Sequence, residues 1–487
     1  MARRRFDLVV CGAGAAGMPC AIAAAEAGAR VVVVEKAAEV GGTLHVAGGH
    51  LSAAGTRRQA ALGIDDRPEW HYEDVMRICG DTADPDLVRL AVAEAGPTVD
   101  WLDELGFPHD PESPQPALIY KPYGVARLHW GDAPGQKGPV ILRTLRPRWD
   151  ALVADGRIEL LLEHGFSTLL VEGGTVVGAC AVGPAGERVE VRAAAVVLAT
   201  GGYASSPKLF AELTPGEPSV VGLARPAATG DGIRAARALG ATVRWADRYL
   251  LNYGIVEDPP GSGRGASRLE AIDLRPTRER REIWVNAAGG RFVAEDVQSL
   301  AEQHRALREQ PGQTAWLVLD EAAVREGPPV HLAWDASELR RRAAERRCAW
   351  SADSLGALAR LAGIAPGGLE RTVTGWNAAC AAGCDPLGRQ TGLVALAEPP
   401  FFAIRMRVGA TISFGGLAVD GDLHVLDATG VAIPGLYAAG EILGAAQTSG
   451  QSYTGGMLLT PALAFGRLLG RRLGARAGGG LAAGAGP

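Results

Sequence analysis

The fold of this chain is decided by its first strand and glycine turn, Phe6-Asp7-Leu8-Val9-Val10-Cys11-Gly12-Ala13-Gly14-Ala15-Ala16-Gly17. An apolar strand runs directly into the pattern G-x-G-x-x-G. An alanine-rich helix follows as far as Gly28, and a second apolar strand, residues 31–34, comes after it. This order predicts a strand–turn–helix–strand unit that binds a dinucleotide at the edge of a parallel sheet.

The glycines and the acid that follows them have separate roles in such a unit. Gly12 allows the tight turn, Gly14 lets the backbone approach a pyrophosphate, and Gly17 lets the helix pack closely on the strand. The pyrophosphate binds to N–H groups at the helix N-terminus. Glu35 ends the second strand, where an acid bonds a ribose hydroxyl. The first predicted cofactor-binding residues are Gly12, Ala13, Gly14, Ala15, Ala16, Gly17, Glu35 and Lys36.

Length, charge and cysteine content narrow the class of protein. A chain of 487 residues suggests two or three domains, and a net charge of −5 indicates neither a nucleic-acid nor a basic membrane surface. The seven cysteines show no C-x-x-C pair and no metal-ligand spacing, so we expect reduced thiols in the cytoplasm and no metal. Asp7 interrupts the apolar run that follows Arg3–Arg5, so we expect no signal peptide. The apolar runs are also too short for a membrane-spanning helix.

More segments that suit an extended cofactor recur along the chain. Glycine pairs follow the second strand, a buried strand ends in Thr-Gly-Gly, and another ends in Gly-Glu. Asp231 begins a helix that it could also cap. The further predicted cofactor-binding residues are Gly41, Gly42, Thr43, Ala47, Gly48, Gly49, Thr200, Gly201, Gly202, Asp231, Gly440, Glu441, Met457, Leu458 and Leu459.

The spacing of apolar residues predicts the order of the domains. A helix over 84–105 has a break at Gly96-Pro97, short strands over 158–191 form a meander, and the dinucleotide-type pattern resumes at Phe401. We therefore expect an α/β fold in which a Rossmann-like dinucleotide-binding domain is split by an inserted α+β cap. The predicted boundaries are 1–252 and 396–474 for the dinucleotide-binding domain, 253–395 for the cap, and 475–487 for a disordered Gly/Ala tail.

These motifs, in this order, resemble the FAD-dependent fumarate reductase and succinate dehydrogenase flavoprotein superfamily, and in particular its 3-ketosteroid Δ1-dehydrogenase branch. The similar pieces cover nearly the whole chain and include residues 12–17, 41–49, 198–202, 286–295 and 435–466. The resemblance implies non-covalently bound FAD, with substrate held between the cap and the flavin ring.

The resemblance also shows where this chain departs from the dicarboxylate enzymes. Their substrate-clamping arginine is replaced by Tyr453, the helping histidine by Ile412, and the proton-donating cap arginine by Ser299. A bidentate carboxylate clamp cannot be built from these side chains. The ketosteroid dehydrogenases carry a tyrosine at the place of Tyr453, which implies a hydrogen bond to a ketone oxygen, supported by N–H groups near Gly456.

The base that removes the α-proton is left open. The ketosteroid enzymes carry a second tyrosine at the place of Ser299, and serine cannot do the same work unaided. Tyr253, at the entry to the cap, is the first candidate, and Tyr123, His129 and His304 are the others. The predicted catalytic residues are Tyr453, Tyr253, Gly456, Ser299, Tyr123 and His129.

We therefore predict a CH–CH oxidoreductase that dehydrogenates a small to medium, cyclic ketone by hydride transfer to flavin N5. One alternative is an enone or enoate reductase that runs in reverse, with Arg127 or a cap arginine as a relocated carboxylate site. Another is a non-catalytic flavin-binding or electron-transfer partner. The sequence has no haem-attachment or iron–sulfur cysteine pattern, so the predicted partner is an external electron acceptor or donor.

Overall fold

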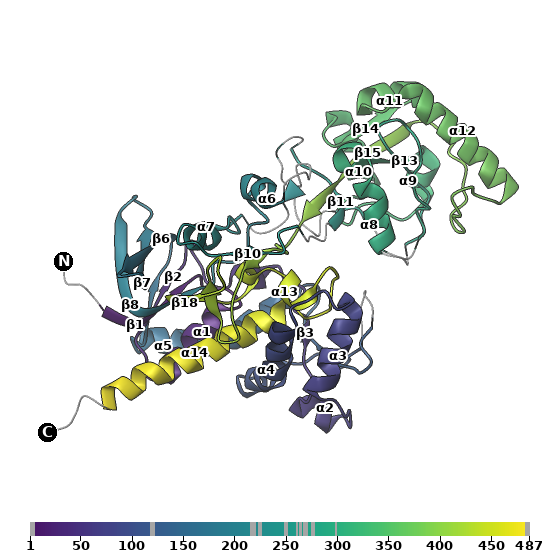
Figure 1. Cartoon of the computed structure of the whole chain (residues 1–487). Coiled ribbons are helices and arrows are strands. Elements are labelled where there is room, and N and C mark those ends of the chain that lie inside the picture. Colours follow the sequence, from purple (N-terminus) through teal and green to yellow (C-terminus); the bar gives the residue numbers. More distant parts are fainter. Residues whose placement is uncertain are drawn as a thin grey trace. The chain divides into compact units, whose positions relative to one another are not determined.

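The computed structural model describes residues 5–116, 122–214, 221–222, 226–247, 252–259, 262, 265, 271–273, 278–297 and 300–482. They divide into two compact units (Figure 1). Unit 1 takes its described residues from 1–209, 224–250 and 412–487, and unit 2 from 210–223 and 251–411. Among the described helices, none is long and apolar enough to cross a lipid bilayer.

Unit 1 is built on a mainly parallel sheet in the order β17-β18-β8-β1-β2-β5. Strand β1 (Arg5–Cys11) pairs in parallel with β2 (Val31–Val34) on one side and with β8 (Arg188–Leu198) on the other. The strand order therefore changes direction at β1, and ligands of such sheets bind at the carboxyl end of the strands at this switch point. The predicted split Rossmann-like architecture is confirmed.

The predicted meander is confirmed only in part. Strands β6 (Gly165–Glu172), β7 (Thr175–Val182) and β8 pair antiparallel in sequence. Strand β5 (Ile158–Leu161) instead extends the parallel sheet beside β2, because its apolar side chains continue the buried layer. The last meander strand and the strand ending at Leu198 are one continuous strand.

The helix over 84–105 is present as α4 (Pro85–Glu104), but the break predicted at Gly96-Pro97 is wrong, because the helix continues through it. A Cβ at Gly96 would lie 2.6 Å from the carbonyl oxygen of Ala54. The helix therefore packs directly on that backbone, and this tertiary contact outweighs the local effect of proline.

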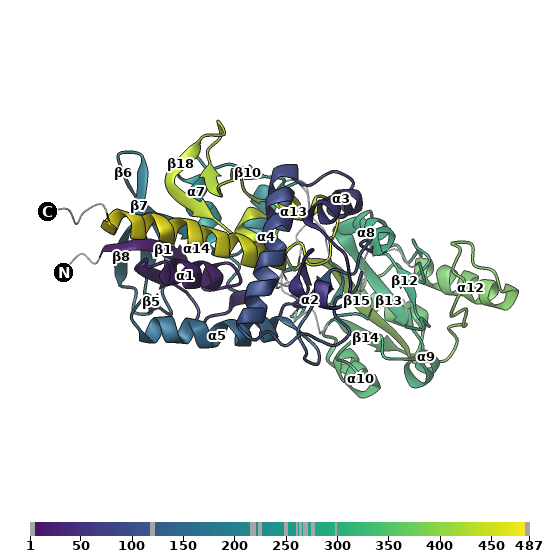
Figure 2. The same cartoon turned by 90° about the horizontal axis from the view of Figure 1, so that it is seen from below.

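Helix α14 (Leu459–Ala482) runs beside α1 (Gly17–Glu26) in both views (Figures 1 and 2). Gly466 and Gly470 make the close approach possible, because a Cβ there would lie 2.1 Å from the oxygen of Ala16 and 2.2 Å from that of Cys20. The tail predicted as disordered from 475 is thus helical to Ala482, since it extends this packed helix.

The remaining elements of unit 1 connect or cover this sheet. They are η1 (Gly42–His45), β3 (Leu51–Ser52), α2 (Arg57–Ala61), α3 (Pro68–Cys79), β4 (Leu128–His129), α5 (Gly138–Ala154), α7 (Asp231–Arg237), β10 (Val243–Arg244), β16 (Gly416–Leu417), β17 (His424–Leu426), β18 (Ala432–Ala438), η3 (Glu441–Leu443) and α13 (Ala446–Ser449). Helix α6 (Pro207–Leu213) begins in unit 1 and ends in unit 2.

Unit 2 is an α+β unit whose central strand is β15 (Phe401–Ala410). The FAD-domain pattern was predicted to resume at Phe401, and this is wrong, because β15 pairs with β11, β13, β14 and β9 of unit 2. The other elements are β9 (Val221–Gly222), β11 (Asn252–Ile255), β12 (Ile283–Val285), α8 (Leu300–Arg308), η2 (Pro311–Gln313), β13 (Thr314–Leu319), α9 (Glu321–Glu326), α10 (Ala336–Glu345), β14 (Ala349–Ala352), α11 (Leu355–Ala362) and α12 (Pro366–Ala382).

A buried carboxylate organises the interior of unit 2. Glu295 is fully buried and accepts hydrogen bonds from the Trp284 N–H at 2.9 Å, from two Arg291 nitrogens at 2.8 and 2.6 Å, and from Arg389 at 3.2 Å. Both guanidinium groups also lie over the ring of Trp376, at 4.5 and 4.8 Å. The charges in this network are satisfied only while every partner is present.

Glu295→Gln should therefore destabilise unit 2 by about 3 to 5 kcal/mol, since it removes the carboxylate that pairs with the buried Arg389 and one of the two that pair with Arg291, which also binds Asp385 at 2.6 Å. Urea unfolding followed by tryptophan fluorescence would measure this. The matched control is Glu398→Gln, whose carboxylate binds Arg325 at 2.6 Å on the exposed surface, and a change below about 1 kcal/mol is expected there. Equal shifts for the two variants would contradict the assigned role of Glu295.

Candidate active site and cofactor site

The glycine turn after β1 is tightly packed at two positions and open at the third. Gly12 has φ 104°, and a Cβ there would lie 2.4 Å from the oxygen of Ala199. At Gly17 a Cβ would lie 1.8 Å from the oxygen of Gly12. At Gly14, in contrast, the nearest atom outside its chain neighbours would be the Cα of Gly42, at 3.8 Å. The turn thus leaves room for a ligand at Gly14, as predicted, and helix α1 begins there without a capping side chain.

Glu35 connects the glycine turn to the end of β2. Its buried carboxylate accepts the N–H groups of Ala13 and Ala37, each at 2.8 Å. A carboxylate has about four acceptor sites, so two bonds to the backbone fix its orientation and leave capacity for ribose hydroxyls.

Lys36 and Asp231, both predicted to bind cofactor, form an ion pair at 2.8 Å. The same ammonium group donates to the Thr229 hydroxyl at 2.8 Å. The predicted capping role of Asp231 is wrong, because Gly230 is the N-cap of α7 and the carboxylate turns toward Lys36 instead. This pair links the end of β2 to the start of α7.

The two glycine pairs after β2 pack in different places. The Gly41 N–H donates to the Ala13 oxygen at 2.8 Å, and Gly42 lies against Gly14, so this pair follows the glycine turn, with Thr43 next in η1. At Gly49 a Cβ would lie 2.3 Å from the backbone of Lys137. The segment Ala47-Gly48-Gly49 therefore contacts the start of α5, where the Ala47 oxygen accepts the Gly138 N–H.

The ends of β8 and β18 meet around a partly buried acid. Glu441 accepts the N–H of Ser413 at 2.9 Å, and burial raises the pKa of its carboxyl. A Cβ at Gly202 would lie 2.5 Å from this carboxylate and 2.2 Å from the Ser413 hydroxyl. The Thr200 hydroxyl is buried without a protein partner. Such a buried polar atom needs a partner, which a bound cofactor can supply.

These features fit a dinucleotide cofactor such as FAD. The room at Gly14, the uncapped helix α1 and the acid at Glu35 suit the pyrophosphate and ribose. Thr200 and Glu441 lie beyond them on neighbouring strand ends. Of the other predicted contacts, Gly201 and Gly440 lie in the loops that follow β8 and β18, Met457 and Leu458 precede α14, and Leu459 is the first residue of α14.

The loop Tyr453–Gly456 packs on the short sheet formed by β3 and β4. Gly456 has φ 78°, and a Cβ there would lie 2.4 Å from the Ser52 nitrogen, so only glycine fits. A Cβ at Gly455 would lie 3.2 Å from Leu128. Tyr453 itself is half-buried. The loop therefore has a fixed backbone from which Tyr453 projects.

Tyr123 holds this loop from the other side. Its hydroxyl donates to the Gly455 oxygen at 2.5 Å, and its electrostatic surroundings include Tyr453, Ser52 and Arg127. Burial raises the pKa of the Tyr123 phenol, so the neutral form dominates. The structure thus brings Tyr123, Tyr453 and Gly456 together, and it favours Tyr123 as a hydrogen-bond donor over the predicted base.

His129 and Arg127 lie behind the same loop and are fully buried. Burial lowers the pKa of His129 to about 3, and its Nε2 lies 3.4 Å from the Ala53 oxygen. Arg127 donates to both oxygens of Asp66, at 3.1 and 2.7 Å, and lies 3.1 Å from Asp74. Its guanidinium is occupied by these carboxylates, so the predicted relocated clamp at Arg127 does not form in this structure.

The side chains of two predicted candidates for the base, Tyr253 and His304, and of the predicted catalytic residue Ser299 cannot be placed. Tyr253 lies in β11, and the structure describes its backbone but not its side chain. His304 likewise lies in α8 without a described side chain, and Ser299 lies outside the described residues. The identity of the base stays a prediction.

The sequence reading missed His71 and Ser52, which lie beside this loop. His71 is fully buried, and its ring contacts the Tyr123 ring edge-on with centroids 5.5 Å apart. The available signal was its position on α3, because His71, Val75 and Ile78 recur on one buried face of that helix. Ser52 carried no comparable signal, since its place depends on contacts with distant segments.

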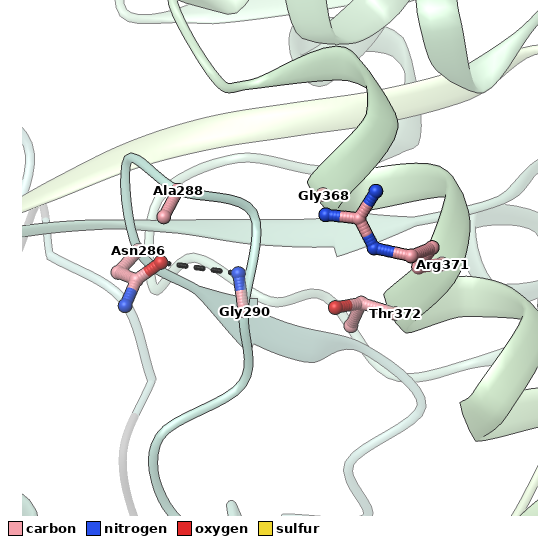
Figure 3. Close-up of a pocket in the computed structure, with 6 residues that line it drawn as sticks. All are labelled: Asn286, Ala288, Gly290, Gly368, Arg371 and Thr372. Atoms are coloured by element: carbon pink, nitrogen blue, oxygen red, sulfur yellow. Dashed lines mark hydrogen bonds between the residues drawn. The ribbon is translucent and has the colours of Figure 1, made fainter.

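A shallow hollow of about 330 Å³ lies in unit 2 (Figure 3). Arg371 and Thr372 of α12 extend toward the turn between Asn286 and Gly290, where the Asn286 side chain accepts the Gly290 N–H at 3.0 Å. Ala288 and Gly368 complete its lining. None of the predicted catalytic residues whose side chains the structure describes lines this hollow.

Comparison with known proteins now identifies the family. A family model described as an FAD binding domain matches residues 7–457. A fumarate reductase (cytochrome) of Shewanella frigidimarina is 30% identical over 466 residues, which cover 95% of this chain and 76% of that protein. The chain belongs to the fumarate reductase flavoprotein family.

Other members of this flavoprotein family act on different molecules. A 4-oxocyclohexanecarboxylate 2-dehydrogenase of Sinomonas cyclohexanicum is 28% identical over 562 residues, which cover 98% of this chain and 94% of that protein. The structure of 3-ketosteroid Δ1-dehydrogenase from Sterolibacterium denitrificans superimposes with a TM-score of 0.76 at 22% identity, covering 97% of this chain and all of that one. The fold is therefore shared across substrate classes.

Membership of this family establishes the identity of the cofactor and the type of reaction. This flavoprotein binds FAD and is an oxidoreductase acting on C=C or CH–CH bonds. The predicted family, fold class and cofactor are thereby confirmed.

Proposed function

We propose that this flavoprotein dehydrogenates a cyclic ketone at the bond next to its carbonyl group. The observation that carries the proposal is that uncharged side chains stand at two positions where the dicarboxylate enzymes carry charge. Tyr453 and Ile412 replace charged residues of the dicarboxylate enzymes, and Ile412 packs with Trp245 and Leu458 against Phe414. A carboxylate brought to this setting would lose hydration without gaining a bidentate partner, whereas a ketone would not.

Tyr453 is assigned the ketone oxygen. Dehydrogenation beside a carbonyl develops negative charge on that oxygen, and a fixed hydrogen-bond donor stabilises it. The backbone around Tyr453 is held by Tyr123 through the Gly455 oxygen, and by Ser52 through close contact with Gly456. A donor fixed in this way loses little in reorganisation when the charge develops.

FAD supplies a hydride acceptor when it is bound. The protein must then take the α-proton. Tyr253 stays the first candidate for this base, with Ser299 assisting. His129 is a weak candidate, because its low pKa makes it a poor proton acceptor. Electrons leave to an external acceptor, which we propose to be a soluble partner, a quinone or oxygen.

One relative supports the choice of a ketone. The dehydrogenase of Sinomonas cyclohexanicum is named for 4-oxocyclohexanecarboxylate, which is a cyclic ketone. The fumarate reductase relatives favour the second candidate, reduction of an unsaturated acid. A cap arginine would then have to supply the carboxylate site, since Arg127 is occupied by Asp66 and Asp74.

Photoreduction of the FAD-loaded protein followed by stopped-flow mixing tests the proposal. Reoxidation by a cyclic enone supports ketone chemistry, and reoxidation by an enoate supports the second candidate. No reaction with either compound, or reaction with quinones alone, would favour the non-catalytic electron-transfer alternative.

A further inference from the structure

Two buried histidines and a third, partly buried one form a cluster behind the loop of Tyr453. His71 lies on α3, His129 on β4, and His109 in the loop after α4. His71 and His129 are 0% exposed, and the side chain of His109 is 9% exposed. Nothing in the ketone chemistry proposed above uses them.

Four ring nitrogens in this cluster are buried without a protein partner. They are both nitrogens of His71 and the Nδ1 atoms of His109 and His129. Buried polar atoms are almost always hydrogen-bonded, and where protein groups are lacking, ordered water takes their place. A neutral imidazole has one donor and one acceptor nitrogen, so water molecules between these rings can be bonded on both sides.

The cluster has an inner and an outer end. At the inner end the His71 ring meets the edge of Tyr123, whose hydroxyl binds the loop of Tyr453 through the Gly455 oxygen. At the outer end the rings of His129 and His109 lie 5.8 Å apart, and the Nε2 of His109 lies 2.5 Å from the Asp103 carboxylate. Asp103 is 23% exposed and so reaches solvent.

Burial, and after it the charges around the cluster, keep the inner rings neutral. Burial and then the positive charge of Arg127 hold the pKa of His71 well below its usual range, and burial lowers that of His129 to about 3. Arg127 is paired with Asp66 and Asp74, and Arg58, which faces His129, donates to the oxygens of Asp110 and Ser113. A neutral imidazole can accept a proton on one nitrogen while releasing one from the other, so it conducts a proton without retaining charge.

We propose that His71, His129 and His109 line a water-bridged path that carries a proton between Tyr123, beside the loop of Tyr453, and Asp103 at the surface. This proposal rests on the proposed function, because the proposed dehydrogenation supplies the proton that the path carries. In dehydrogenation the β-hydrogen leaves with its electron pair to FAD, the α-hydrogen leaves as a proton, and the electrons of the α-C–H bond form the C=C bond. That proton must reach solvent, and the reverse reaction draws one in.

A high-resolution crystal structure of the FAD-loaded protein tests the path without any turnover. We expect ordered water within about 3.2 Å of the Nδ1 and Nε2 atoms of His71 and of the Nδ1 atoms of His109 and His129. Nitrogens that contact only protein carbon atoms would overturn the proposal, whatever the substrate proves to be.

His71→Phe tests the path in solution, with photoreduced protein and cyclohex-2-enone as the probe. We expect the rate of flavin reoxidation to fall on the order of ten- to a hundredfold, within the range for lost proton transfer, with a larger solvent deuterium effect and partial rescue by added imidazole. FAD absorbance and melting temperature should stay unchanged. The control is His424→Phe, because His424 binds Asp420 and Tyr437 elsewhere in unit 1.

Unchanged rates and isotope effects in His71→Phe would overturn the path. If that variant fails to fold, His129→Phe takes its place with the same readouts. A wild-type protein that does not react with the enone contradicts the proposed function instead, and the water positions then decide the path alone.

Discussion

Gly14→Val yields a folded but colourless protein. A Cβ added at Gly14 would have only the Cα of Gly42 within 4 Å, at 3.8 Å, so we expect the fold to accommodate valine, whereas its side chain would fill the space into which a pyrophosphate must come. We expect FAD affinity to fall at least about a hundredfold, or about 2.8 kcal/mol. Flavin absorbance after gel filtration and titration of the apoprotein with FAD would measure the loss.

Gly17→Val, three residues away, is the matched control. Its Cβ would lie 1.8 Å from the Gly12 oxygen, so the helix can no longer pack on the strand and the protein itself should be destabilised. Circular dichroism and melting temperature therefore separate the two variants. A yellow Gly14→Val protein would mean that the opening turn does not hold the cofactor.

Tyr453→Phe keeps FAD but slows the reaction with ketones and enones by roughly ten- to a thousandfold, the range for loss of one donor to a developing oxyanion. The aromatic ring is retained, and the loop backbone stays fixed by Tyr123 and Ser52, so only the hydroxyl is tested. Stopped-flow measurement of flavin reoxidation at saturating enone gives the rate directly.

Tyr437→Phe serves as the control for Tyr453→Phe. The hydroxyl of Tyr437 accepts from Arg476 at 3.2 Å, so its removal should leave the rate within a factor of about two. Equal rates for wild type and Tyr453→Phe would remove Tyr453 from the chemistry and leave the substrate oxygen without an assigned donor.

Local features of the cofactor site could be predicted from the sequence because their causes are local. The φ of 104° at Gly12 and the packing of Gly17 on the Gly12 oxygen arise within the turn itself, and Glu35 follows at the end of the adjacent strand. The same local reasoning failed at Pro97 and Phe401, where the contact of Gly96 with Ala54 and the pairing of β15 in unit 2 decide the outcome.

The candidate catalytic site depends on contacts that sequence patterns do not contain. Tyr123 bonds Gly455 across 332 positions of the chain. From the sequence, Arg127 was a candidate cation in a loop. In the structure it is fully buried and forms ion pairs with Asp66 and Asp74. The spacing along its helix predicts only that His71 is buried. Its contact with Tyr123 arises from the packing of segments that are distant in the sequence, which this spacing does not reveal.

The central claim, that this flavoprotein acts on a ketone-conjugated bond, is tested most directly by one comparison. The photoreduced, FAD-loaded protein is mixed anaerobically with equal concentrations of cyclohex-2-enone and, separately, fumarate, and flavin absorbance is followed by stopped flow. The account predicts reoxidation by the enone at least about tenfold faster than by fumarate, which corresponds to about 1.4 kcal/mol or more in the barrier. Faster reoxidation by fumarate would contradict it.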